Sequence, residues 1–368
     1  MGASVASGTI RAGYLPSLDG LRAVAIVIVV LGHASLPSPL KGSTGVTLFF
    51  FLSGYLITTL LRVEGDRKGC ISIRDFYLRR VFRIMPPLYA ALLVAIVLVL
   101  VGVTASGMTV AGAISSGTFW SNYYIIGAAR TGIPAGTNQL WSLAVEEHYY
   151  LLFPLLYVAM RRWLPRRLHQ CIVLVAICIA LMAWRVVLFR EGAGFDRLYL
   201  ATDTRADAIL WGAVLAVGLN PIYDEVRVPQ RRWLMSVVLL AGVVVFWVTS
   251  KTPDFFGMTF GYTIQSLSLF AVFVPLLTVP RSIIGRILNW RPIAFLGVLS
   301  FSLYLIHRLA LELAETYLPG PHVLRVGIAI VAAVAVAYLM HIAIERPFAV
   351  LRKRISHAGE SMDQTGAS

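Results

Sequence analysis

A histidine and an arginine lie on one apolar segment near the start of the chain. Arg22 and His33 are eleven residues apart in the stretch Leu18-Asp-Gly-Leu-Arg-Ala-Val-Ala-Ile-Val-Ile-Val-Val-Leu-Gly-His33, a spacing close to three helical turns. In a helix both side chains would face the same side, about 16 Å apart along the axis. A histidine inside a membrane helix is costly, which favours a functional role for His33. Arg22 is equally compatible with a cation that reaches the membrane surface.

Two adjacent carboxylates form a second candidate site. Glu146 and Glu147 end the stretch Trp141-Ser-Leu-Ala-Val-Glu-Glu147, about 9 to 11 Å inside the predicted outer end of a helix. Carboxylates in a membrane are expensive if they only solubilise an edge. Adjacent helical residues point about 100° apart, so we expect one of the pair, preferably Glu146, to face the site.

Other polar groups interrupt later apolar segments. Arg205 and Asp207 stand at the start of one, and His307 lies about 20 Å into another. For His307 an interhelical hydrogen bond and a catalytic role are equally compatible with the pattern.

An arginine cluster precedes the third apolar segment. Arg79, Arg80 and Arg83 are three and four residues apart, so a helix would give them a common cationic face. The forked donors of arginine suit phosphate. Arginines at this place also set the orientation of membrane helices, and the pattern alone favours that role.

The elements that carry these residues are those of a polytopic membrane protein. Of the 368 residues 58% are hydrophobic and only 14% are charged, against about 25% charged in soluble domains. Apolar runs long enough to cross a bilayer recur along the chain. We predict an all-α fold with about ten transmembrane helices at 21–36, 44–62, 86–105, 140–159, 171–190, 206–219, 233–250, 261–280, 294–317 and 323–344. A re-entrant segment is predicted at 111–127.

Basic residues concentrate in alternate connections between these spans. The rule that such connections are cytoplasmic places both termini in the cytoplasm, and it explains the net charge of +14 without nucleic acid. We divide the chain into a short cytoplasmic segment (1–14), one membrane domain (15–350) and a polar, disordered cytoplasmic tail (351–368).

Seven motifs in order resemble the acyltransferase 3 family of membrane acyl transferases, over almost the whole chain. They are Leu18-Asp-Gly-Leu-Arg-Ala with His33, Phe49-Phe-Phe-Leu-Ser-Gly54, Arg80-Val-Phe-Arg-Ile-Met-Pro86, Trp141-Ser-Leu-Ala-Val-Glu-Glu147, Thr204-Arg-Ala-Asp-Ala208, Ser302-Leu-Tyr-Leu-Ile-His307 and Glu345-Arg-Pro347. The resemblance implies an enzyme of a bacterial cytoplasmic membrane. It would move an acyl group, usually acetyl from acyl-coenzyme A, onto a hydroxyl of a sugar, a lipid-linked glycan or a glycosylated natural product. His148 departs from the family, which more often has Gln there.

The resemblance and the residue chemistry together suggest roles. Acyl-coenzyme A is expected as a donor substrate and not as a resident cofactor, and no metal is expected. The donor phosphates are assigned to Arg22, Arg79, Arg80 and Arg83. The catalytic candidates are His33, Glu146, Glu147 and His307. The substrate-binding candidates are Trp141, Asn122, Arg205, Asp207 and Tyr304.

In the predicted mechanism His33 takes the proton of the acceptor hydroxyl as its oxygen attacks the thioester, and Glu146 orients the imidazole. Direct transfer and a covalent acyl-histidine both stay open. A proton-coupled secondary transporter is the alternative function, because intramembrane His, Arg and Glu also mark proton or solute pathways. The two functions differ in that only the enzyme releases free coenzyme A.

Overall fold

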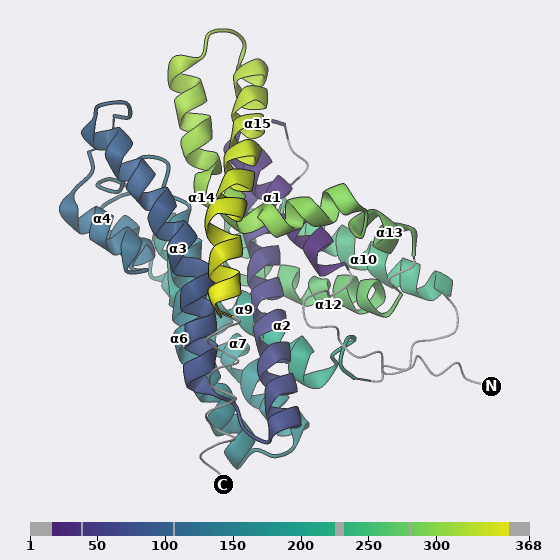
Figure 1. Ribbon diagram of the computed structural model, residues 1–368. Helices are drawn as coiled ribbons and strands as arrows, with labels where there is room; N and C mark the ends of the chain where they lie inside the picture. Colours follow the sequence, from purple (N-terminus) through teal and green to yellow (C-terminus); the bar gives the residue numbers. More distant parts are fainter. Residues whose placement is uncertain (1–16, 38–39, 106, 225–231, 280–281, 353–368) are drawn as a thin grey trace. The chain divides into compact units, whose positions relative to one another are not determined.

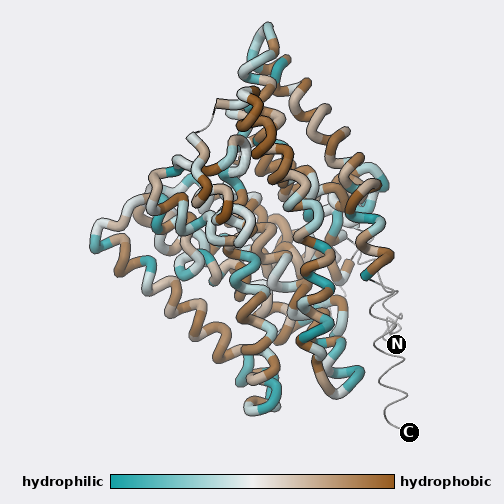
Figure 2. The backbone as a smooth tube through the Cα atoms, turned by 60° about the vertical axis from the view of Figure 1, so that its left-hand side comes forward, coloured by the Kyte–Doolittle hydropathy of each residue, from teal (hydrophilic) through white to brown (hydrophobic). Residues whose placement is uncertain are grey.

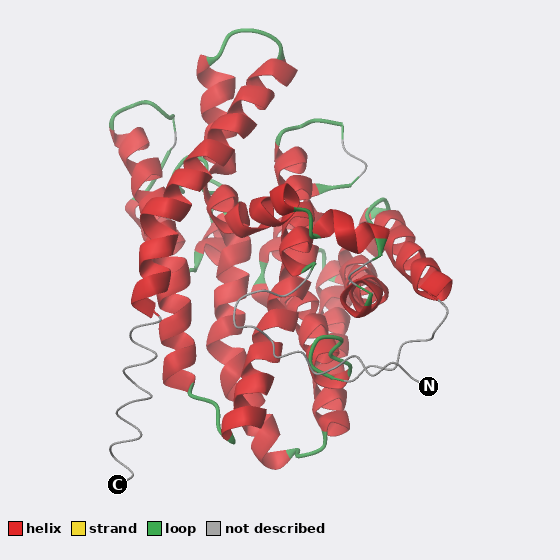
Figure 3. Cartoon of the chain, turned by 45° about the vertical axis from the view of Figure 1, so that its right-hand side comes forward, coloured by secondary structure: helices red, strands yellow, loops and turns green. Residues whose placement is uncertain are grey.

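The computed structural model describes residues 17–37, 40–105, 107–224, 232–279 and 282–352. Within these ranges the chain forms helices joined by loops and contains no β-strand (Figure 3). The all-α prediction is therefore confirmed for this part of the chain. The predicted segment 1–14 and all but the first two residues of the predicted tail lie outside the described residues.

Six helices are long and apolar enough to cross a membrane, judged by length and composition. They are α2 (Gly42–Lys68), α3 (Ile73–Leu100), α7 (Arg167–Arg190), η1 with α12 (Gly257–Thr278), α14 (Arg291–Tyr317) and the helix His322–Arg352, which contains α15 (His322–Met340) and η2 (His341–Glu345). Hydrophobic residues cover much of the length of the long helices (Figure 2). The chain is therefore a multi-pass membrane protein.

The other four predicted spans also overlap helices, although these helices do not meet the same criteria. They are α1 (Leu18–His33), α6 (Leu140–Trp163), α9 (Thr202–Gly218) and α10 (Arg232–Thr249). The predicted re-entrant segment consists of two short helices, α4 (Val110–Gly117) and α5 (Ser121–Gly127). The remaining short helices are α8 (Phe195–Leu200), α11 (Asp254–Phe256) and α13 (Ile283–Leu288). Figure 1 labels α13 and the long helices.

The chain divides into two compact units, which are described one at a time. Unit 1 takes its residues from Met1–Gly69 and Leu156–Ser300, and unit 2 from Cys70–Leu155 and Phe301–Ser368. The divisions fall within α6 and α14, so each of these helices contributes to both units.

In unit 1 the backbones of α2 and α9 touch. A Cβ at Gly54 would lie 1.8 Å from the carbonyl oxygen of Ile209, and a Cβ at Gly212 would lie 2.1 Å from that of Phe51. Glycine is thus required on both helices, as in other close helix pairs of membrane proteins. This contact makes α2 a buried helix of the unit although its composition would also suit contact with lipid.

In unit 2 hydrogen bonds tie α6 to its neighbours. Tyr77 of α3 donates to the carbonyl of Leu151 at 2.6 Å, and the Gln139 amide, just before α6, donates to the carbonyl of Leu305 on α14 at 3.0 Å. These bonds fix the heights of α3 and α14 along α6.

The predicted start of the third span was wrong by thirteen residues. The span was placed at 86–105, whereas α3 begins at Ile73 and contains Pro86 and Pro87 in its interior. Ser72 caps the helix, its Oγ accepting from the Asp75 N–H at 3.2 Å. Because the arginines before Pro86 are hydrophilic, a search for apolar runs does not detect the helix start at Ile73. The arginine cluster therefore belongs to the same helix as the apolar span.

The predicted end of the last span, at residue 344, was also wrong. The last helix passes through Pro347 and ends at Arg352. Proline removes only its own N–H from the helical ladder, and it can kink a helix without ending it. Arg352 is thereby placed on a helix instead of in a disordered tail.

Candidate functional site

Arg22 and His33 lie on one uninterrupted helix, α1. The Arg22 guanidinium pairs with Asp19 at 3.0 Å in the first turn, and both side chains remain partly exposed. His33 is the last residue of α1, so the helix ends three residues before the predicted end of the span. The continuous helix supports the common stripe and the separation of about 16 Å derived from the spacing.

The end of α1 is held against the start of α2. A Cβ at Gly32 would lie 2.5 Å from the Cα of Gly42, so the two backbones are in direct contact beside His33. His33 is thus carried by a rigid junction of two helices in unit 1, and its side chain is half-buried.

The two carboxylates of α6 have different surroundings in unit 2. Glu146 Oε2 accepts a hydrogen bond from the Tyr150 hydroxyl at 3.1 Å. Glu147 has a buried oxygen, Oε1, that accepts no hydrogen bond from the described residues. Because a buried carboxylate oxygen without a donor is costly, Glu147 is the carboxylate of this pair that lacks part of its hydrogen bonding.

Arg80 lies beside these carboxylates. Its guanidinium stands over the rings of Tyr150 and Phe76, at 5.4 and 5.7 Å from their centres, and its charge acts on Glu147. We expected the arginines at the cytoplasmic surface and the glutamates near the outer surface. The structure instead places Arg80 and Glu147 at the same level along the neighbouring helices α3 and α6 of unit 2.

The lengths of the two helices explain this difference. From Arg80, α3 continues for twenty residues to Leu100, or about 30 Å, whereas α6 begins only seven residues, about 10 Å, before Glu147. The start of α6 therefore does not reach as far outward as the end of α3.

The arginine cluster is divided between two faces of α3. Arg80 faces α6, whereas Arg79 and Arg83 lie close enough to Arg352 for the three charges to repel one another. Phe82 stacks on Phe348 beside them, with ring centres 6.3 Å apart. The single cationic face expected from the spacing is thus two groups with different neighbours.

Tyr304 and His307 make hydrogen bonds typical of structural residues. The Tyr304 hydroxyl bonds to the carbonyl of Gln139 and to the hydroxyl of Ser142 at 2.6 Å. His307 is 1% exposed, and its Nδ1 lies 2.8 Å from the carbonyl of Tyr304. A carbonyl partner requires a proton on Nδ1, so this histidine is bonded to its own helix. This bond lies within α14 and is not the interhelical bond considered from the sequence, so the role of His307 stays a prediction.

The two other predicted substrate-binding residues of unit 2 are buried. Trp141 on α6 is 7% exposed, and Asn122 on α5 is fully buried. Neither presents a surface in this state of the unit, and their substrate-binding role stays a prediction.

Asp207 in unit 1 is held by an arginine that the sequence analysis missed. Both residues are fully buried, and Arg185 bonds to both carboxylate oxygens, at 2.7 and 2.9 Å. Thr263 donates a third hydrogen bond at 2.7 Å. The signal for Arg185 was available, since an arginine inside an apolar span requires a partner. This pairing is that of a structural ion pair.

Arg205 is also fully buried, but no carboxylate pairs with it among the described residues. Its guanidinium lies 3.6 Å from the centre of the Tyr262 ring, and its Nη2 donates to the Thr47 hydroxyl at 3.1 Å. Its Nε and Nη1 have no hydrogen-bond partner in the described chain. The two arginines therefore differ, since Arg185 is paired with a carboxylate and Arg205 instead stands over an aromatic ring.

Two further polar groups had no clear sequence signal. In unit 1 the buried Arg62 bonds to both carboxylate oxygens of Asp224. Burial alone would raise the pKa of Asp224, but the hydrogen bonds from Arg62 hold it below its usual range. In unit 2 Glu345 bonds to Ser302 and to His341, each at 2.6 Å. Both groups fasten helices together.

Comparison with known proteins agrees with the motif pattern. The family described as "Acyltransferase domain" matches residues 15–342. The putative peptidoglycan O-acetyltransferase YrhL of Bacillus subtilis (strain 168) is 33% identical over 307 residues, which are 80% of this chain and 48% of that protein. Peptidoglycan O-acetyltransferase OatA of Listeria monocytogenes is 27% identical over 347 residues, which are 91% of this chain and 56% of that protein.

A putative O-acetyltransferase of Staphylococcus aureus (strain COL) is 27% identical over 315 residues, which are 83% of this chain and 52% of that protein. The chain thus spans about half the length of the curated relatives it matches. No solved structure matches it significantly. The family match covers most of the chain and all seven motifs except the last, and on this basis the chain belongs to the acyltransferase 3 family of membrane enzymes that transfer acyl groups.

Proposed function

We propose that this protein transfers an acetyl group from acetyl-coenzyme A to a hydroxyl of a cell-surface glycan of the peptidoglycan type. The relatives' names, which include peptidoglycan O-acetyltransferases, support the acetyl group and the glycan. The observation that carries the donor is α1, one rigid helix with Arg22 near its start and His33 at its end. About 16 Å separates them, a length that suits a donor with phosphates at one end and a thioester at the other.

The proposed topology has ten spans with both termini in the cytoplasm of a bacterium. It is supported by the ten predicted spans, each of which overlaps a helix, and by the basic connections on alternate sides. Arg22 then lies at the cytoplasmic end of α1, where coenzyme A is available, and His33 lies toward the outer side.

Neutral His33 is the proposed general base. It accepts the proton of the acceptor hydroxyl while the oxygen attacks the thioester carbonyl, and the carbon–sulfur bond then breaks. The imidazolium returns the proton to the coenzyme A thiolate. His33 therefore ends the cycle neutral, and the products are the O-acetyl ester and free coenzyme A.

Glu147 is the proposed catalytic carboxylate of α6. The sequence favoured Glu146, but Glu146 already accepts a hydrogen bond from Tyr150, whereas a buried oxygen of Glu147 accepts none from the described residues. A carboxylate that orients a catalytic histidine stabilises its charged form.

Arg80 is the proposed phosphate ligand of the arginine cluster, together with Arg22. It is the arginine of α3 that lies beside the carboxylates of α6, whereas Arg79 and Arg83 lie near Arg352. Guanidinium groups suit phosphate because they donate two parallel hydrogen bonds.

Turnover by the purified protein tests this function. The wild type in lipid nanodiscs is given acetyl-coenzyme A with a panel of acceptors, namely peptidoglycan fragments, other bacterial polysaccharides and simple glycosides, and free thiol is measured. Thiol release that depends on a peptidoglycan fragment, together with an ester on that fragment, is expected. Release that depends on none of the acceptors would contradict the proposal, as would solute movement across the bilayer without thioester consumption.

A further inference from the structure

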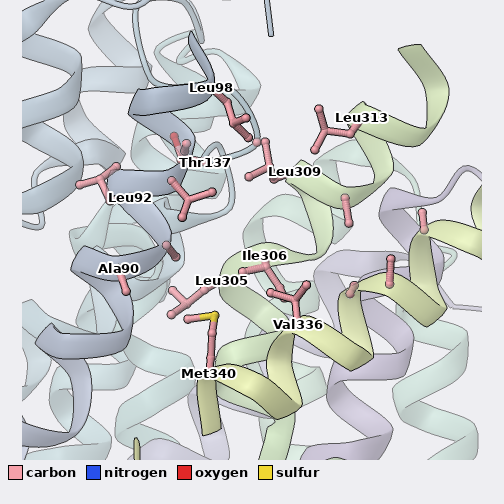
Figure 4. Close-up of a pocket in the computed structure, with 18 of the residues that line it drawn as sticks. Ala90, Leu92, Leu98, Thr137, Leu305, Ile306, Leu309, Leu313, Val336 and Met340 are labelled. Atoms are coloured by element: carbon pink, nitrogen blue, oxygen red, sulfur yellow. The ribbon is translucent and has the colours of Figure 1, made fainter. Parts of the chain in front are cut away.

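Unit 2 contains a long apolar groove that the proposed reaction does not use. Its volume is about 640 Å³, which is within the range of about 300–1,000 Å³ for small-molecule sites. The walls are formed by α3, α14 and the helix of α15, as Figure 4 shows with Leu92 and Leu98 facing Leu309 and Leu313. The groove runs along α3 from Leu88 to Leu98, or about 15 Å.

The groove is open to the side on which lipid would lie. Three of its lining residues keep about half of their surface exposed, namely Val94 at 52% and Ile328 and Val336 at 45% each. All are apolar and belong to helices long enough to cross a membrane. The groove is therefore accessible from the hydrocarbon region of the bilayer.

The lining excludes a polar occupant. Of the 25 lining residues only Thr137 and Tyr317 carry a polar group, and both hydroxyls already donate to backbone carbonyls, those of Pro134 and Val103. The pantetheine arm of coenzyme A has two amides, and the N–H and C=O groups of both would lack hydrogen-bond partners in the groove. A hydrocarbon chain has no such requirement.

A cationic cluster lies just beyond the inner end of the groove. Arg83 is five residues, about 8 Å, before Leu88 on α3, and Arg352 is eight residues, about 12 Å, after Ile344 on the facing helix. Arg79 is the third member, and the three charges repel one another. A bound phosphate would offset this repulsion.

The two helices are aligned at this place by an aromatic contact. Phe82 of α3 stacks on Phe348, with ring centres 6.3 Å apart. Phe82 directly precedes Arg83, so the stack joins the two helices at the level of the arginines, beside the inner end of the groove.

We propose that this groove is a binding site for an anionic membrane phospholipid. Its phosphate is held by Arg79, Arg83 and Arg352, and one acyl chain lies in the groove. Along α3 the groove and the spacing to Arg83 together span about 23 Å, similar to the thickness of one leaflet with its headgroups, about 20–23 Å. Basic sites between helices on the cytoplasmic side are known positions for anionic lipid headgroups. The inference does not depend on the identity of the acyl donor.

Native mass spectrometry of the detergent-purified protein with dioleoyl phosphatidylglycerol and dioleoyl phosphatidylcholine tests the proposal. The wild type should retain phosphatidylglycerol in preference to phosphatidylcholine. Arg83→Gln combined with Arg352→Gln should weaken phosphatidylglycerol binding about tenfold or more, since each arginine near a membrane surface contributes about a factor of five. Arg74→Gln, an exposed arginine on the same helix, is the control and should keep the preference.

A second pair of variants tests the groove itself. Val94→Trp places an indole in the groove, whereas Val97→Trp changes a similarly exposed valine of the same helix that does not line it. Lipid retention should fall in the first variant only, with both proteins monodisperse. Equal retention of the two lipids by the wild type would overturn the proposal. Lipid retention by Val94→Trp equal to that of the wild type would also overturn it. Displacement of the lipid by millimolar coenzyme A would overturn it as well, because it would assign the arginines to the donor.

Discussion

The guanidinium of Arg80 lies 5.4 Å from the centre of the Tyr150 ring, and Tyr150 donates a hydrogen bond to Glu146. A cation and two carboxylates therefore meet on α3 and α6 within one unit. Arg80 is therefore the arginine of α3 at which the proposed phosphate-binding role is tested.

Arg80→Gln should raise the KM for acetyl-coenzyme A by about ten- to a hundredfold, because hydrogen bonds to charged groups contribute about 1.5–3 kcal/mol. Arg74→Gln removes an exposed arginine of the same helix and is the control; it should leave this KM within a factor of two. Steady-state thiol release over a range of donor concentrations gives both values. An unchanged KM in Arg80→Gln would remove Arg80 from the donor site.

Asp207→Asn should destabilise the protein by about 3–5 kcal/mol, because it leaves Arg185 charged and unpaired in a fully buried position. Arg185→Leu combined with Asp207→Leu should recover much of this loss, since no buried charge remains. Unfolding in mixed micelles measures both. Asp207→Asn with wild-type stability and a raised acceptor KM would instead support the substrate-binding role predicted from the sequence.

Arg205→Met should change stability by less than about 1 kcal/mol. The lost contact with the Tyr262 ring contributes about 2 kcal/mol, but the substitution also removes two guanidinium nitrogens that lack partners. If Arg205 binds an anionic part of the acceptor, the acceptor KM should rise while the fold persists. A large loss of stability would show that the charge is structural, as it is for Arg185.

Gly54→Ala should prevent the packing of α2 on α9, because the added methyl group would lie 1.8 Å from a carbonyl oxygen. We expect a loss of at least about 3 kcal/mol, at the upper end of overpacking effects. Gly327→Ala is the matched control, since nothing lies within 4 Å of a Cβ there and alanine is the better helix former by about 1 kcal/mol. The midpoint of thermal unfolding should therefore fall in Gly54→Ala and rise in Gly327→Ala. A shift of both midpoints in the same direction would contradict the described contact.

Much of the fold follows from the sequence because apolar length is a local property. Each of the ten predicted spans overlaps a helix, including the α1 segment that carries Arg22 and His33, although several spans run a few residues past the helix end. The errors arose where a local pattern is misleading. The arginines before Pro86 concealed thirteen residues of α3, and the last span was ended at residue 344 although the helix continues through Pro347.

The site was less predictable because its contacts join residues far apart in the chain. Asp207 looked like a substrate ligand until Arg185, twenty-two residues away, was found to occupy both of its oxygens. Tyr304 similarly bonds to Gln139 and Ser142, more than 160 residues earlier. Spacing within one helix predicts which side chains share a face, but it contains no information on which partner another helix supplies.

The most direct measurement is thiol release from acetyl-coenzyme A by His33→Ala, with the best acceptor and with donor at saturation. His169→Ala, which removes an exposed histidine at the start of α7, is the control. The account predicts that turnover falls by about 10²- to 10⁴-fold in His33→Ala, the usual effect of losing a general base, and is unchanged in the control. Wild-type turnover in His33→Ala would contradict the assignment of His33 as the base.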